Sequence, residues 1–113
     1  MELFDSSIRT KGDLAGVFEY DGTGGPNNST AYFYLYRTND GEADGVMDTI
    51  HILSGAWAIT QADIAVKWDK GEQRVGLFIF GALRAAFDTA SGKKYGGDYR
   101  ADFNPDIPWS NFK

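Results

Sequence analysis

The chain has 113 residues, enough for one domain spanning residues 1–113, and its lack of cysteine excludes disulfides, thiolate metal sites and cysteine nucleophiles. Its formal net charge of -5 argues against binding to nucleic acid or to anionic membranes, because both need clustered lysine and arginine. The first residues lack the basic and apolar runs of a secretory signal, and no apolar run could span a membrane. We therefore expect a soluble, cytoplasmic protein.

The first half of the chain predicts strands that alternate with polar loops. Residues 1–13 fit either an edge strand or a loosely ordered arm. Leu14–Tyr20 has the pattern of a strand, which the turn-forming residues of Asp21–Ser29 end. Thr30–Arg37 is rich in aromatic residues that favour a pleated surface, so it is predicted to pair with the strand before it. A second polar loop, Asn39–Gly45, follows.

The segment Val46–Leu53 is ambiguous between a strand and a helix. Some of its apolar residues have helical spacing, whereas Asp48–Ile52 alternates between polar and apolar residues. Its β-branched residues favour the strand. Ser54–Asp63 has no sustained period, and we predict a connection with room for one helical turn before Asp63.

The stretch Ile64–Asp88 predicts three antiparallel strands joined by two tight turns, and the rest of the fold is organised around it. Its middle strand is apolar at nearly every position, so both of its faces are expected to be covered. Gly81 and Ala82 suit a two-residue type II′ turn, in which glycine supplies the positive φ at the first position. This turn would pair Phe80 with Leu83.

The other turn of this stretch sets the register of its first two strands. Asp69–Gly71 suits a three-residue loop that would pair Trp68 with Glu72. Because paired residues share a face, the two turns together predict one aromatic core face. That face would carry Ile64, Val66, Trp68, Phe78, Phe80, Leu83 and Phe87.

The C-terminal part of the chain consists of a segment with few apolar residues and then an apolar tail. Thr89–Asp98 is rich in glycine and lysine, and the tail Tyr99–Lys113 carries several large apolar residues. So much apolar surface is expected to pack back across a sheet. The segments together predict a mainly β fold, a single antiparallel curved sheet, sandwich or partly open barrel with a packed C-terminal tail.

An acidic loop is the one candidate for a metal site. Asp40, Glu42, Asp44 and Asp48 fall at the first, third, fifth and ninth positions of a calcium loop. The twelfth position is His51 where that loop needs a bidentate glutamate, and no helix clearly flanks the segment. A solvated turn is therefore favoured over a calcium site, and no cofactor is predicted.

The single histidine, His51, lies between two isoleucines and is the one candidate for a general base. In a strand, Asp48 and His51 point to opposite faces, so the two side chains would not pair. The sequence also lacks a nucleophile motif such as Gly-x-Ser-x-Gly. A structural histidine is favoured, and no catalytic residue is predicted.

A tyrosine stripe is the strongest candidate for a binding surface. Tyr32, Tyr34 and Tyr36 share one strand face, and Tyr20 is a candidate to join them together with His51. Phenol rings combine apolar faces with polar tips, which suits sugars, bases or a protein partner. The alternative is that the C-terminal tail or the N-terminal arm covers the stripe.

The order of these segments resembles a family of small, uncharacterised bacterial proteins, a domain of unknown function. The resemblance spans most of the chain and implies a compact bacterial protein, without transferring any catalytic residue. The residues that carry it are Val17–Thr23, Tyr32–Tyr34, Asp48–Ile52, Val66–Trp68, Leu77–Ile79 and Ala86–Asp88.

The acidic balance and the missing catalytic constellation favour a non-enzymatic binding module. We expect a protein partner with a basic surface, of the kind that toxin-neutralising immunity proteins engage. The alternative is a small-ligand-binding protein or weak hydrolase that uses His51 in a pocket between the sheet and the tail. A homodimer through an edge strand is also compatible with an open sheet.

Overall fold

The computed structural model describes residues 2–21, 29–39, 42–55 and 59–97. As predicted, the fold is mainly β and antiparallel. Its strands form two four-stranded sheets, in the orders β1-β2-β3-β4 and β5-β6-β7-β8, rather than a single curved sheet. Neither sheet closes into a barrel within these residues. The elements are β1 (Glu2–Ile8), β2 (Leu14–Asp21), β3 (Thr30–Asn39), β4 (Glu42–Ser54), the 3₁₀ turn η1 (Gln61–Asp63), β5 (Ile64–Trp68), β6 (Arg74–Ile79), β7 (Ala82–Asp88) and β8 (Lys93–Gly96).

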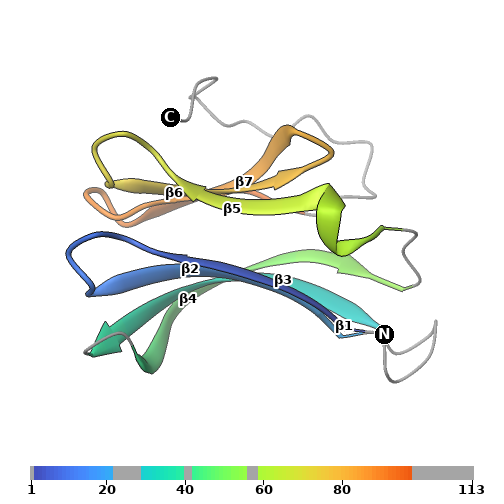
Figure 1. The fold of residues 1–113 in the computed structure, drawn as a ribbon, viewed down its shortest axis with the longest axis horizontal. Helices are drawn as coiled ribbons and strands as arrows, with labels where there is room; N and C mark the ends of the chain where they lie inside the picture. Colours follow the sequence, from blue (N-terminus) through green and yellow to red (C-terminus); the bar gives the residue numbers. More distant parts are fainter. Residues whose placement is uncertain (1, 22–28, 40–41, 56–58, 98–113) are drawn as a thin grey trace.

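The two sheets form two layers that face each other, with the first sheet below and the second above in Figure 1. The core lies between them, because period-two alternation places every second side chain of each sheet on the inner face. The rings of Phe33 and Phe87 meet across the layers. The largest fully buried side chains are Phe18, Phe33, Ile52 and Leu53 from the first sheet and Val75, Leu77, Ile79 and Phe87 from the second.

The N-terminal segment is an edge strand, which decides between the two predictions for residues 1–13. β1 pairs with β2 along its whole length. Side chains bridge the neighbouring edges of β1 and β5: the Gln61 amide bonds with both the N–H and the carbonyl of Phe4 in β1, and the Asp5 carboxylate of β1 accepts the N–H of Val66 in β5 at 2.7 Å. These bonds satisfy edge groups that would otherwise be open to a further strand.

The predicted turn between β6 and β7 is wrong by one residue. Ile79 pairs with Ala82, so the turn residues are Phe80 and Gly81, with φ of 51° and 79°. Positive φ at both positions is what a type I′ turn requires. Phe80 is therefore 59% exposed at the tip of the hairpin rather than buried in the core.

The shifted register also exchanges the faces of β6. Val75, Leu77 and Ile79 point into the core, and Phe78 lies on the outer face beside Lys67. Trp68 pairs with Val75 rather than with Glu72, because the loop between β5 and β6 is longer than predicted. The predicted core positions of Ile64, Val66, Trp68 and Phe87 are correct, and those of Phe78, Phe80 and Leu83 are wrong.

Three further predictions concern the connections. The strand predicted at Val46–Leu53 is confirmed, although β4 starts earlier, at Glu42, and so shortens the polar loop before it. The helical turn before Asp63 is confirmed as η1. β8 lies within the glycine- and lysine-rich segment Thr89–Asp98, for which no strand was predicted, and the tail Tyr99–Lys113 lies outside the described residues.

Candidate binding face

The outer face of the first sheet, here called the tyrosine face, gathers the side chains that point away from the core. Cross-strand pairing aligns them in rows, because directly paired residues share a face. Phe4, Glu19, Tyr32 and His51 occupy one such row across all four strands. The members of the tyrosine face are Phe4, Ser6, Ile8, Ala15, Val17, Glu19, Tyr32, Tyr34, Tyr36, Thr49 and His51.

The three tyrosines of β3 form a continuous ladder of rings. The ring centroids of Tyr32 and Tyr34 lie 5.8 Å apart in a stacked arrangement, and those of Tyr34 and Tyr36 lie 5.7 Å apart edge to face. The His51 ring meets Tyr32 at 5.4 Å, also edge to face. Both geometries are favoured for aromatic pairs, so the ladder is a pre-organised surface of half-buried rings.

Tyr20, the candidate fourth tyrosine, lies on the opposite face of the sheet. Its side chain is only 3% exposed and belongs to the core between the layers. Its hydroxyl donates to the Gly55 carbonyl oxygen at 3.2 Å, which satisfies the one polar atom of a buried phenol. The ladder therefore consists of Tyr32, Tyr34 and Tyr36 without Tyr20.

A groove of about 260 Å³ runs along the tyrosine face beside this ladder. Sequence analysis missed it, because its two walls come from strands far apart in the chain. Two of its apolar members are strongly exposed, Phe4 at 54% and Ile8 at 47%. The groove is lined by Phe4, Ser6, Ile8, Ala15, Val17, Glu19, Tyr34, Tyr36 and Thr38.

The electrostatics of the groove are set by one carboxylate. Glu19 is the single charged residue among the described residues that line it. Its carboxylate forms no hydrogen bond or ion pair with any residue that the structure describes. Burial raises the pKa of Tyr34, and the negative charge of Glu19 raises it further. The groove is thus apolar along its length and acidic at one end.

His51 has a serine rather than an aspartate as its side-chain neighbour. Its Nε2 lies 2.8 Å from the Ser54 Oγ, and both residues lie at the exposed end of β4. The Asp48 carboxylate instead accepts bonds from the Lys94 ammonium group at 3.0 Å and from the Thr49 N–H at 2.9 Å. As predicted from strand geometry, Asp48 and His51 do not pair.

The acidic loop proposed for calcium lies partly in β4. Residues 42–48 run along an extended strand paired with β3. No group of three potential metal ligands converges among the side chains that the structure describes. Asp40 and the side chains of Glu42 and Asp44 lie outside that part, so the solvated turn favoured over a calcium site stays a prediction.

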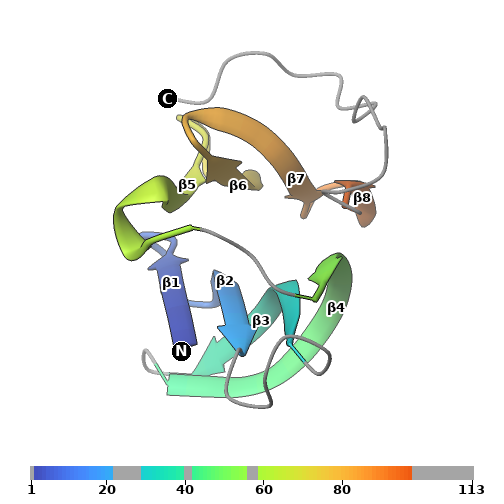
Figure 2. The ribbon, with the colours of Figure 1, turned by 90° about the vertical axis from the view of Figure 1, so that its right-hand side faces the viewer.

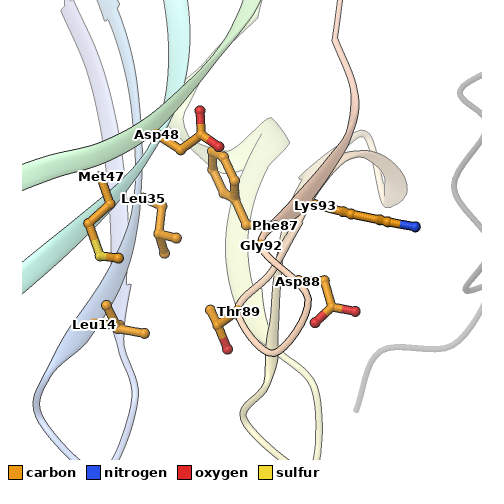
Figure 3. Close-up of a pocket in the computed structure, with 9 residues that line it drawn as sticks. All are labelled: Leu14, Leu35, Met47, Asp48, Phe87, Asp88, Thr89, Gly92 and Lys93. Carbon is orange, nitrogen blue, oxygen red and sulfur yellow. The ribbon is translucent and has the colours of Figure 1, made fainter.

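A second cavity, of about 190 Å³, opens between the two sheets (Figure 3). Leu14 and Leu35 form its wall on the first sheet, and Phe87 and Thr89 face them from the second. Asp88 and Lys93 at its rim point away from the first sheet. Figure 2 shows β4 and β8 on the same side of the molecule, where Lys94 bridges to Asp48 next to this cavity.

These features define a class: a mainly β protein of two antiparallel sheets with an aromatic outer face. The chain belongs to the family described as "Uncharacterized protein conserved in bacteria (DUF2251)", whose model matches residues 2–111. This confirms the resemblance seen in the sequence. No curated protein and no solved structure matches the chain. Within the described residues, no helix is long and apolar enough to cross a membrane.

Proposed function

We propose that this chain is a non-enzymatic interaction module that binds a protein partner through the tyrosine face. The observation that carries the proposal is the ladder of Tyr32, Tyr34 and Tyr36 beside a groove with exposed Phe4 and Ile8. Aromatic residues are enriched in the buried centres of protein interfaces, where they bring large contact area and polar tips. Contiguous exposed apolar patches are typical of interaction sites.

The charge of the chain favours a basic partner. The net charge of -5 produces a field that attracts positive surfaces and repels nucleic acid and anionic lipid. Glu19 places a carboxylate directly on the tyrosine face. Immunity proteins act as acidic, compact modules that cap a basic surface of their partner. We propose this class for the chain.

Removing two rings of the ladder tests the proposal. The double variant Tyr34→Ser, Tyr36→Ser should lose a specific partner that the wild-type protein retains in affinity capture from a bacterial lysate. Phe80→Asn is the matched control, because it removes an exposed aromatic ring from the second sheet. Equal retention of the partner by both variants, with both folded by circular dichroism, would refute the proposal.

A second copy of the chain is another partner that we consider. Light scattering of the same proteins tests whether they form a homodimer. A wild-type dimer that the tyrosine double variant converts to a monomer would identify a second copy of this chain as the occupant of the tyrosine face. A dimer that survives the double variant would place its interface elsewhere, such as at an edge strand.

The alternative function is binding of a small ligand. The pocket predicted for it, between the sheet and the C-terminal tail, involves residues outside the described part of the chain, and the cavity between the sheets is a second candidate site (Figure 3). Its volume of about 190 Å³ lies below the roughly 300 Å³ at which common ligand pockets begin, so only a small molecule would fit. His51 does not line this cavity, so the cavity gives no support to a hydrolase that would use this histidine. Saturation-transfer NMR with small aliphatic fragments tests it, with Leu35→Trp as the variant that fills the space.

For the fold we propose a sandwich completed by the C-terminal tail. Gly76 and Ala86 pair with each other and lie buried although they face away from the core, which supports a cover on the outer face of the second sheet. A chain truncated after Gly97 should then be less stable to urea than the full chain. Equal stability of the two chains would refute this arrangement.

A further inference from the structure

The groove on the tyrosine face has the shape of a trough whose axis follows β2. Glu19, Val17 and Ala15 succeed one another along this strand at every second position. At about 3.4 Å per residue, the distance from Glu19 to Ala15 is roughly 14 Å. A peptide in extended conformation covers that length with about four residues.

Large side chains form the two walls of the trough and small ones form its floor. On one side Phe4 and Ile8 project from β1, and on the other Tyr34 and Tyr36 project from β3. Ala15 lies between the walls in the row that joins Ile8 to Tyr36. The trough is therefore deepest at the end opposite Glu19, where it can receive an apolar side chain.

The negative charge at the other end of the trough favours a positively charged group of the ligand. The Glu19 carboxylate lies in the row between Phe4 and Tyr32, without an ion-pair partner among the described residues. The aliphatic stem of a lysine or arginine can lie along aromatic faces while its head reaches a carboxylate. A neutral or acidic ligand would leave Glu19 uncompensated as the groove is desolvated.

The tyrosine hydroxyls add a second kind of recognition. No residue that the structure describes forms a hydrogen bond with the hydroxyl of Tyr34 or of Tyr36. Each is therefore available to donate to a backbone carbonyl of a bound peptide. Sheet neighbours fix both rings in place, so little conformational entropy is lost on binding.

From these observations we infer that the groove binds an extended basic segment of the partner protein. A lysine or arginine pairs with Glu19, and an apolar residue two to four positions away fills the space above Ala15. This inference rests on the proposed function and specifies which part of the partner the tyrosine face recognises.

A displayed library of random heptapeptides tests the inference on the full-length protein. Peptides selected on the wild-type protein should share one lysine or arginine and an apolar residue two to four positions from it. Fluorescence polarisation with one labelled peptide should then show at least about a tenfold loss of affinity for Glu19→Gln, because a charge-assisted contact is removed. The wild-type affinity should fall as salt is raised.

Ala90→Lys is the control for net charge. It changes the charge of the chain by the same amount as Glu19→Gln, at an exposed position in the turn between β7 and β8. It should bind the peptide as tightly as the wild-type protein. An equal loss of affinity in both variants would refute a local contact with Glu19 and assign the effect to the general field.

Further outcomes separate this inference from the proposed function. Selected peptides that lack a basic residue, or that bind Glu19→Gln as tightly as wild type, would refute the inference while leaving the interaction module in place. The same holds if no peptide is selected although Tyr34→Ser, Tyr36→Ser abolishes capture of a partner. Peptides that bind this double variant unchanged would refute the groove as their site.

Discussion

The rings of Phe33 and Phe87 meet between the two sheets, with centroids 5.1 Å apart and an interplanar angle of 34°. Phe33 comes from the middle of the first sheet and Phe87 from the second, and both are fully buried. Their contact joins the layers at the centre of the core, so the sheet that carries the tyrosine face depends on it for support.

Truncating either ring should destabilise the protein strongly. Phe33→Ala or Phe87→Ala is expected to lower the free energy of unfolding by about 3 to 5 kcal/mol, because burial is lost and a cavity remains. A double-mutant cycle with the milder Phe→Leu substitutions should give a coupling of about 0.5 to 1.5 kcal/mol in urea denaturation. A coupling of zero would show that the rings act independently.

At Gly16 the two sheets approach each other closely. A Cβ added there would lie 2.4 Å from Cγ2 of Val75 and 3.0 Å from Cγ1 of Val66. Gly16→Ala should therefore cost about 1 to 3 kcal/mol through overpacking. Val75→Ala should offset part of that cost, so the double variant loses less stability than the sum of the single variants. Additive losses would contradict this contact.

Gly71→Ala is the control for this experiment. Nothing lies within 4 Å of a Cβ at Gly71, and its φ is not positive. Its unfolding free energy should stay within about 0.5 kcal/mol of wild type or rise slightly, because alanine restricts the unfolded chain.

The hairpin between β6 and β7 shows why one register could not be predicted. Glycine at Gly81 fits the first position of a type II′ turn or the second position of a type I′ turn, and the two differ by one residue. β6 is apolar on both faces, so its hydrophobic pattern does not favour either. Packing against the first sheet decides, and it places Leu77 rather than Phe78 in the core.

For the tyrosine face, in contrast, the local sequence pattern was enough to predict part of the site. Strict alternation in β3 was enough to predict that Tyr32, Tyr34 and Tyr36 share a face. The groove beside them depends on which residues of β1 and β2 stand opposite, and local pattern carries no information on that pairing. Glu19 could therefore be assigned to the site only from the register of β2.

Phe80→Asn should stabilise the protein. Phe80 has a φ of 51° and a largely exposed ring, and its N–H donates to the Asp63 carbonyl oxygen, a bond that asparagine keeps. Asparagine followed by glycine is the preferred pair for a type I′ turn, so a gain of about 1 kcal/mol in urea denaturation is expected. Phe80→Ala keeps the unfavourable φ and should show no such gain. A loss of stability in Phe80→Asn would indicate that the ring is needed.

An ion pair at the β1–β2 hairpin should make stability depend on pH in the acid range. The Arg9 guanidinium donates to both carboxylate oxygens of Asp13, at 2.6 and 2.7 Å, and lowers the pKa of that carboxyl from 3.8 to about 2, mainly through these hydrogen bonds. Because the folded pKa is depressed, the stabilisation is fully present above pH 3.8 and is lost as the pH falls toward 2. The difference in unfolding free energy between wild type and Asp13→Asn should therefore be constant at pH 5 to 7 and shrink between roughly pH 4 and 2. A difference that does not change over this acid range in urea titrations would contradict the pair.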